Sequence, residues 1–215
     1  ANDVDGGDAL ELSAPTLPSW LDFSDNGDGT GILSGTPLND QVGDHEVELL
    51  VTDIAGATGI QSFTITVANT NDAPIFTSAG DTTATEDSLY SYSIISSDVD
   101  EGDELFITAS TLPGWLQLVD NGDGTGTLEG APENADVGDH GVVLRVTDES
   151  GTFAVQSFVI SVENTNDAPV FISEAITEAT EDEGYSYIVI ANDVDGGDAL
   201  ELSAPTLPSW LDFSD

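Results

Sequence analysis

The chain has 215 residues, of which 42 are aspartate or glutamate and one, Arg145, is lysine or arginine, so its formal net charge is −41. This charge excludes binding to a nucleic-acid backbone or an anionic membrane surface, since both need basic residues, and it makes a cation the natural partner. Hydrophobic residues make up 39% of the chain, which is enough for a folded protein, and no apolar run reaches the roughly 20 residues of a membrane-spanning helix.

The chain repeats itself with a period of 95 residues. The first 25 residues return unchanged at 191–215, and Trp20, Trp115 and Trp210 follow the same step. Because the middle of the chain diverges from its two ends, we expect an alternating array whose two-repeat period is 190 residues. We expect the chain to continue covalently beyond this window. Strand donation between separate chains is the alternative.

The hexapeptide N-T-N-D-A-P marks the seams between repeats. It occurs at 69–74 and again at 164–169. Cutting there predicts three parts: 1–72, a repeat that lacks its first strands; 73–167, a complete repeat; and 168–215, the N-terminal part of the next repeat.

Period-2 alternation predicts short strands throughout the complete repeat. At its start, Tyr90, Tyr92 and Ile94 alternate with serines. In chain order, strands are expected over 75–78, 90–95, 105–110, 115–119, 125–129, 142–147 and 157–162. About seven strands without any helical period predict an all-β fold of tandem Ig-like or cadherin-like Greek-key sandwiches.

Three further motifs indicate architecture and not sites. The segment D-N-G-D-G-T-G at 25–31 and 120–126 is similar to a calcium loop, but glycines stand where oxygen ligands are needed, so a hairpin turn is favoured. Trp115 lies beside core strands, which favours a buried anchor over a sugar-stacking platform. His45 and His140 occupy equivalent V-G-D-H turns, and no G-x-S-x-G motif occurs. We therefore predict that the protein is not an enzyme.

Aspartates gather in loops that directly follow a predicted strand. The pattern D-V-D-x-G-D occurs at 3–8, 98–103 and 193–198. Two carboxylates about 5 Å apart repel each other by roughly 3 kcal/mol at an effective dielectric constant of ~20. One such loop could simply be solvated. Its recurrence beside the asparagine-rich seams favours a hard cation with six to eight oxygen ligands, and flexible loops favour calcium over magnesium.

The combination of motifs resembles a known family. The N-T-N-D-A-P linkers, the strands ending in V-T-D, the D-V-D loops and an early glutamate resemble the cadherin-like repeats of bacterial and dystroglycan-type surface proteins. The segments G-T-P at 35–37 and D-V-G-D-H at 136–140 are similar to the Putative Ig repeats of the same group. The resemblance covers the whole chain. In cadherins, calcium lies at the junction between consecutive domains, which implies the same location here.

The resemblance implies two sets of calcium ligands. At the first junction these are Asn69, Asn71, Asp72, Asp98, Asp100, Asp103 and Asp148. At the second junction they are Glu86, Asn164, Asn166, Asp167, Asp193, Asp195 and Asp198. Two departures leave the number of ions per junction open between one and three. The linker begins with asparagine and is one residue shorter than in cadherins, and D-R-E is absent, with Asn134 and Asp136 as its stand-ins.

Together these features predict a calcium-stiffened tandem repeat that serves as the shaft of a bacterial adhesin or fibril, located outside the cell or at its surface. The expected partners are calcium ions and adjacent repeats joined head to tail, with neighbouring fibrils or surface glycans as further candidates. Nucleic acid and membrane insertion are excluded. The alternative is a carbohydrate-binding accessory module of a secreted polysaccharide-degrading protein, with Trp20 and Trp115 as stacking surfaces if they are exposed.

Overall fold

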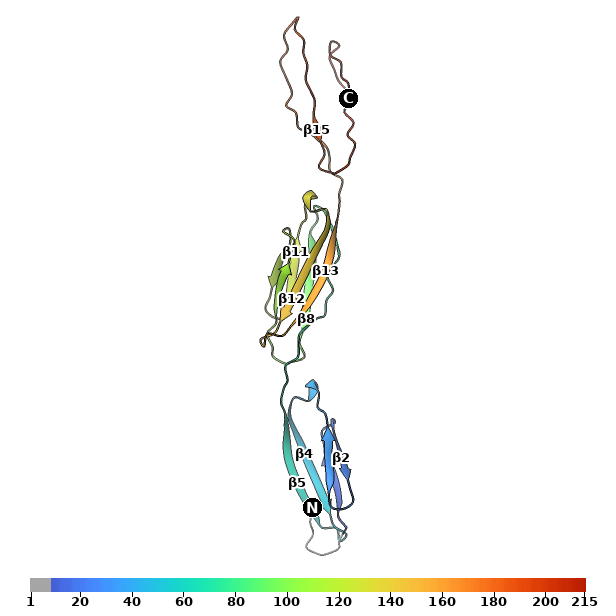
Figure 1. Ribbon diagram of the computed structural model, residues 1–215, viewed down its shortest axis with the longest axis vertical. Helices are drawn as coiled ribbons and strands as arrows, with labels where there is room; N and C mark the ends of the chain where they lie inside the picture. Colours follow the sequence, from blue (N-terminus) through green and yellow to red (C-terminus); the bar gives the residue numbers. More distant parts are fainter. Residues whose placement is uncertain (1–8) are drawn as a thin grey trace. The chain divides into compact units, whose positions relative to one another are not determined.

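A computed structural model describes residues 9–215 (Figure 1). Its helical content is limited to two short 3-10 turns, η1 (Asn39–Gln41) and η2 (Asn134–Asp136). None of the described helices is long and apolar enough to span a bilayer. The chain divides into two compact units: one holds the described residues up to Ala73 together with Asp98–Asp103, and the other holds Pro74–Ser97 and Glu104–Asp215. The predicted all-β fold is confirmed.

The second unit contains a complete β-sandwich. Its strands are β6 (Ile75–Phe76), β7 (Thr83–Thr85), β8 (Tyr90–Ser97), β9 (Phe106–Thr111), β10 (Gln117–Asp120), β11 (Thr125–Gly130), β12 (Gly138–Thr147) and β13 (Phe153–Glu163). They form two four-stranded sheets, ordered β10-β11-β8-β6 and β7-β13-β12-β9. Only the β7–β13 pair is parallel among these pairings. The sequence predicted every strand except β7.

The core of the sandwich follows the alternation in the sequence. In β8, Tyr90, Tyr92 and Ile94 are buried, and the two serines between them are exposed. Near the end of the strand, Ser96 is buried. The inner faces of both sheets meet at fully buried aliphatic side chains, among them Leu128 of β11 and Leu144 of β12. Because successive side chains of a strand point to opposite faces, the other half of each strand faces outward.

The first unit repeats part of this plan. Its strands are β1 (Glu11–Thr16), β2 (Leu21–Asp25), β3 (Gly31–Gly35), β4 (Gly43–Thr52) and β5 (Thr58–Val67). β1, β4 and β5 form one sheet, and β2 and β3 form a hairpin. The predicted glycine-rich turn closes that hairpin: the Asn26 N–H donates to the Thr30 carbonyl over 3.0 Å, and Gly27 and Gly29 have φ of 75° and 78°.

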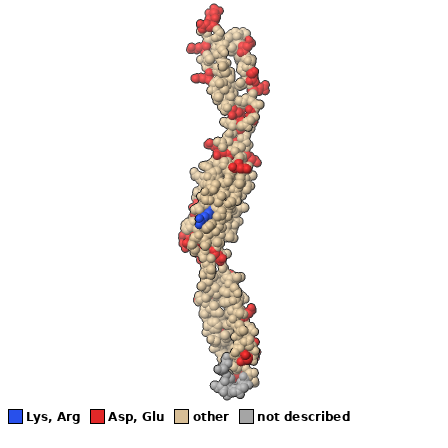
Figure 2. Space-filling view, viewed as in Figure 1, with Lys and Arg blue, Asp and Glu red and all other residues tan. Residues whose placement is uncertain are grey.

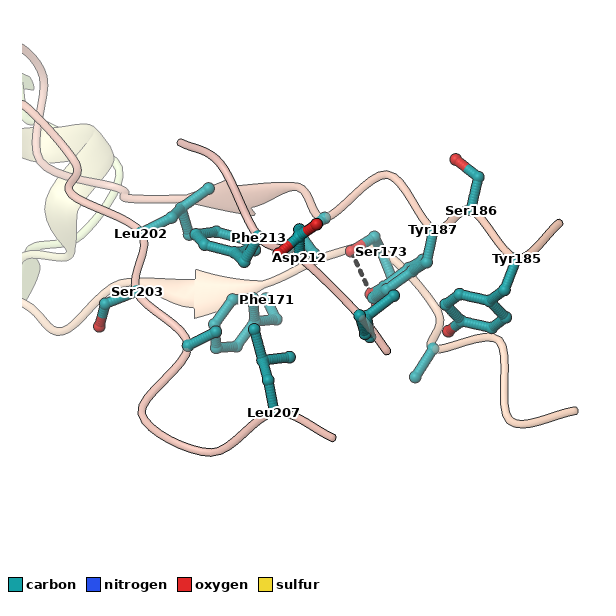
Figure 3. A pocket seen from close by; sticks show the side chains of 14 residues that line it. Phe171, Ser173, Tyr185, Ser186, Tyr187, Leu202, Ser203, Leu207, Asp212 and Phe213 are labelled. Atoms are coloured by element: carbon teal, nitrogen blue, oxygen red, sulfur yellow. Dashed lines mark hydrogen bonds between the residues drawn. The ribbon is translucent and has the colours of Figure 1, made fainter. Parts of the chain in front are cut away.

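Residues 168–215 form an open half of a sandwich with two short strands, β14 (Val170–Phe171) and β15 (Ala191–Asn192). Side chains that correspond to core positions of the complete sandwich line a cavity of about 550 Å³ in this segment. Tyr185 and Tyr187, which correspond to Tyr90 and Tyr92, lie there, and the Tyr187 hydroxyl is 2.6 Å from Ser173 Oγ (Figure 3).

Candidate metal-binding clusters

The D-V-D-x-G-D loops at 98–103 and 193–198 fold their three aspartates toward one another, and the loop at 3–8 lies outside the described residues. In the loop after β8, the Asp100 N–H donates to Asp98 Oδ1 over 3.0 Å, and the Asp103 N–H lies 3.5 Å from the Asp100 carbonyl. Gly102 has φ of 99°, a conformation that favours glycine. As a result, one carboxylate oxygen from each aspartate lies within 4.8 Å of the other two.

The first linker is bonded to this loop. The Asp72 N–H donates to Asp100 Oδ2 over 2.7 Å, and the Asn39 side-chain amide donates to Asp72 Oδ2 over 2.6 Å. Asp100 is 6% exposed, and its Oδ1 is buried without a hydrogen-bond partner, as is Oδ2 of Asp98. At about 4.8 Å and an effective dielectric constant of ~20, two such charges repel by about 3 kcal/mol, so the loop presents oxygens that a cation can satisfy.

The same loop geometry recurs at Asp193, Asp195 and Asp198 in the second unit. The Asp195 N–H donates to Asp193 Oδ1 over 3.0 Å, and the three carboxylates again lie within 4.8 Å of one another. The Asp167 N–H of the linker donates to Asp195 Oδ2 over 2.6 Å. Asp195 Oδ1 accepts the side-chain amide of Asn164 over 3.0 Å. The equivalence of the two loops therefore extends to their contacts with the linkers.

A further acidic group in the second unit contains the most buried carboxylate of the described residues, Glu86, which is 1% exposed. Its Oε2 accepts the Thr165 N–H over 3.2 Å, but its Oε1 is buried and has no hydrogen-bond partner. Asp87 has φ of 58°, and its N–H donates to the Pro132 carbonyl. Asp87 and Asp167 each place a carboxylate oxygen within 4.8 Å of a carboxylate oxygen of Glu86. A buried carboxylate with one unpartnered oxygen beside two more anions is unfavourable unless a cation accompanies it.

The electrostatics of Asp167 connect the two acidic groups of the second unit. Burial raises the pKa of Asp167, and the negative charges of Glu86 and Asp195 raise that pKa further, followed by those of Asp87 and Asp193. The pKa of Asp167 is therefore raised by negative charges from both acidic groups.

Most of the predicted ligands lie in these clusters. Among the others, the side-chain amides of Asn71 and Asn166 donate to the next residue's carbonyl over 2.6 and 2.7 Å. Asn69 is exposed. Asp148 is buried and accepts the Thr152 N–H over 2.8 Å, so it caps the β12–β13 turn. The assignment of all the predicted residues as calcium ligands, these four included, stays a prediction.

Three cluster residues stand outside the predicted ligand sets. Asp87 follows Glu86 in a T-E-D motif that returns at 180–182. Asn134 donates its side-chain amide to Asp195 Oδ1 over 3.2 Å, in keeping with its expected stand-in role. Asn39, its counterpart one repeat earlier, bonds Asp72 and was missed. The equivalent positions of Asn39 and Asn134 in the repeat were the sequence signal that could have identified Asn39.

The donor set of all three clusters consists of carboxylate, amide and backbone oxygens. These are the ligands of calcium, which takes six to eight of them in flexible geometry. The described residues of the clusters include no histidine, and the chain has no cysteine, so the donors do not suit zinc or other thiophilic metals. The chemistry of the residues fits calcium.

Both histidines pack against a tryptophan of the same repeat. His45 and His140 lie edge-on to Trp20 and Trp115, with ring centroids 5.7 and 5.9 Å apart. Each histidine Nε2 also contacts a backbone carbonyl of the preceding 3-10 turn, at 2.6 and 2.5 Å. Trp115 packs against the core, as predicted, and its second edge-on neighbour is Tyr90 at 5.8 Å.

The fold defines tandem Ig-like and cadherin-like β-sandwiches. Residues 1–68 and 73–163 match the model of the family described as "Putative Ig domain", and the chain belongs to this family. No curated protein matches the chain.

Solved structures with a similar fold include cadherin extracellular regions. The protocadherin GammaB4 extracellular domain is 19% identical with a TM-score of 0.58, and the match covers 88% of this chain and 32% of that one. The protocadherin gammaB7 EC3-6 cis-dimer is 20% identical with a TM-score of 0.56, covering 88% and 49%. At these identities the likeness shows the fold alone.

A second group of similar structures consists of glycoside hydrolases. The endo-fucoidan hydrolase MfFcnA4 from glycoside hydrolase family 107 is 27% identical, and the match covers 74% of this chain and 24% of that one. Its TM-score is 0.40, which carries no functional argument. The chain thus spans between about a quarter and a half of the length of these structures.

Proposed function

We propose that the protein is a non-enzymatic, calcium-stiffened shaft of an extracellular bacterial adhesin or fibril, in which calcium ions clamp successive repeats at the N-T-N-D-A-P linkers. The Ig-like and cadherin-like family supports an extracellular structural module. The net charge of −41 supports a cationic ligand.

The observation that carries the calcium proposal is the carboxylate of Glu86. It is 1% exposed, one of its oxygens has no hydrogen-bond partner, and the carboxylates of Asp87 and Asp167 converge on it. A solvated acidic loop would expose such charges to water. Here the charge is removed from water and directed at two further anions, an arrangement that a divalent cation stabilises.

The residues supply a physical account of stiffening. In the second unit, Glu86, Asp87 and Asp167 would hold one ion, and the D-V-D-x-G-D loop at 193–198 would hold another. Asp167 would then lie between the two ions. The ion supplies positive charge that offsets the repulsion between carboxylates. Pro74 and Pro169, which end the linkers, fix φ and restrict the backbone further. Without calcium, repulsion favours opening of the linker.

The carbohydrate-binding alternative depends on exposed tryptophan rings. Trp20 and Trp115 are half-buried, and each packs edge-on against a histidine. No described feature of these rings favours sugar stacking over packing.

Isothermal titration calorimetry of the whole chain tests the proposal. We expect saturable calcium binding with a Kd of about 10⁻⁴ to 10⁻³ M or tighter, as in extracellular calcium modules, and much weaker binding of magnesium. Asp139→Asn is the matched control for loss of one charge, because Asp139 is exposed on β12 and belongs to none of the clusters. The absence of a calcium-specific heat at millimolar calcium would contradict the proposal.

A further inference from the structure

The single basic residue of the chain lies on an apolar sheet surface. Arg145 is on β12, and its guanidinium carbon is 3.8 Å from the centre of the Phe153 ring on β13. Phe106 of β9 and Phe153 both pair with Thr147, so the two rings flank the same position on one face of the sheet. Figure 2 shows the basic side chain on the molecular surface, with tan side chains on one side of it and acidic side chains nearby at the edge of the view.

This outer face of β9, β12 and β13, which we call the arginine face, is exposed, and its two carboxylates, Asp139 and Glu163, lie at the end of the strands opposite to Phe153. Phe106, Phe153, Val155 and Val159 are 44%, 50%, 53% and 51% exposed. Within residues 9–215, no carboxylate makes an ion pair with Arg145, although the chain has 42 acidic residues. A contiguous apolar surface with an available guanidinium has the composition of an interaction surface, in which aromatic residues and arginine are enriched.

The first unit carries a different version of the same face. A shift of one repeat, 95 residues, places Glu11, Glu46 and Glu48 at the positions of Phe106, Gly141 and Val143. Val47 between the two β4 glutamates is 1% exposed and points into the core, so both glutamates point outward. We call the outer face of β1, β4 and β5 the glutamate face. It also presents Leu50 and Ile60, and Ile60 is 64% exposed.

We propose that the arginine face of one chain docks laterally on the glutamate face of a second copy. Arg145 then pairs with the carboxylates of Glu46 and Glu48, and Phe153 and Val155 cover the aliphatic side chains of the glutamate face. Burial of a guanidinium against a carboxylate and an aromatic ring is a strong and specific contact. Because residues 9–215 carry one complete face of each kind, the contact joins unlike surfaces and can propagate from chain to chain. The inference goes beyond calcium clamping along one chain.

The size of the face sets the strength of the contact. Each face consists of one strand of six residues and two of ten or eleven residues. At about 4.8 Å between strands and about 3.4 Å per residue, it presents a surface of about 400 Å². A standard interface buries about 800 Å² on each partner, so one pair of faces binds weakly and the repetition of both faces along an array strengthens the association. The net charge of −41 opposes the approach of two chains. At 0.15 M salt the Debye length is about 8 Å, which screens this repulsion more than it weakens a direct contact.

Sedimentation equilibrium of the full chain tests the inference at about 0.15 M salt with saturating calcium, where screening is effective. We expect association that increases with protein concentration up to about millimolar, in the range of weak contacts. Arg145→Glu and Glu48→Arg should each reduce it by at least about tenfold, the equivalent of about 1.4 kcal/mol. An equimolar mixture of these two variants should associate again, because the intact arginine face of Glu48→Arg can then dock on the intact glutamate face of Arg145→Glu, and the two reversed charges also attract each other. Arg145→Gln, which keeps the side chain polar without reversing its charge, should reduce association less.

Matched apolar substitutions distinguish association through the arginine face from non-specific hydrophobic association. Val155→Ser should weaken association, and Val119→Ser should not, although Val119 on β10 is similarly exposed at 50%. Circular dichroism checks that each variant folds, and unchanged calcium binding by Arg145→Glu separates this inference from the calcium proposal. A monomeric wild-type chain, equal association of Arg145→Glu, or binding of an acidic polysaccharide by a chain that stays monomeric would each overturn the inference.

Discussion

Replacing Glu86 with glutamine should change stability in opposite directions with and without calcium. Glutamine keeps an oxygen in place to accept the Thr165 N–H, which Glu86 Oε2 accepts over 3.2 Å. Its amide group replaces Oε1, the buried oxygen without a hydrogen-bond partner, and can donate to a neighbouring carboxylate. The substitution therefore removes a buried negative charge and leaves the local hydrogen bond intact.

The expected magnitude follows from the distance to Asp87. At a separation of 4.8 Å, the outer limit for these oxygens, the Glu86–Asp87 repulsion is about 3 kcal/mol at an effective dielectric constant of ~20. Solvent screening reduces this value because Asp87 is exposed. In chelator, the variant should be more stable than the wild type by about 1 to 2 kcal/mol, which raises the Tm of a domain of this size by roughly 5 to 15 °C. In calcium at 100 times its Kd, the wild type should gain about 2.7 kcal/mol per bound ion, and the variant should lose most of that gain.

Thermal melts of the whole chain, followed by circular dichroism in chelator and in calcium, give all four Tm values. Glu163→Gln is the matched control, because it makes the same chemical change at an exposed position at the end of β13, near Glu86. Its effect should be small and equal in both conditions. A Glu86→Gln effect of the same sign with and without calcium, or an undiminished calcium shift, would refute the reasoning.

Three further predictions concern the linker, pH and packing. Asp100→Asn should abolish calcium-dependent shifts of the linker amide signals in NMR spectra and leave the complete repeat folded; unfolding of that repeat would contradict the assignment. The pKa of Asp167 is raised above its ordinary value of 3.8, so protonation favours the folded state, and in chelator the Tm should fall as the pH rises through the folded-state pKa. Asp167→Asn should flatten this dependence, and an unchanged pH profile would contradict the assignment of the dependence to Asp167. Gly130→Ala should cost roughly 1 to 3 kcal/mol in urea unfolding, since its Cβ would collide with the Trp115 carbonyl, whereas Gly141→Ala, with open space around it, should cost little.

The sequence predicted the fold where strands are long and alternate. The alternation of Tyr90, Tyr92 and Ile94 with serines placed β8 and its buried face correctly. β7 was missed because Thr83–Thr85 is too short to show a period, and its parallel pairing with β13 is set by tertiary contacts. The 3-10 turns were missed for the same reason, since three residues carry no helical period.

The clusters were predictable where their residues are close in sequence. The three aspartates of 98–103 lie within six residues, so their convergence follows from a single tight loop. Asp87 is the neighbour of Glu86 in the T-E-D motif, and it joins the cluster with a φ of 58°. Asn39 reaches Asp72 across 33 residues, a contact fixed only by the packing of the repeat.

The most direct test of calcium clamping is the distance distribution between two adjacent repeats. Because the chain has no cysteine, Ser34→Cys on β3 and Ser93→Cys on β8, both exposed, can be spin-labelled selectively and measured by double electron–electron resonance. We predict one narrow distance distribution in calcium and a broad one in chelator, with the change lost in a chain that also carries Asp100→Asn. Distributions of equal width in calcium and in chelator would contradict the account.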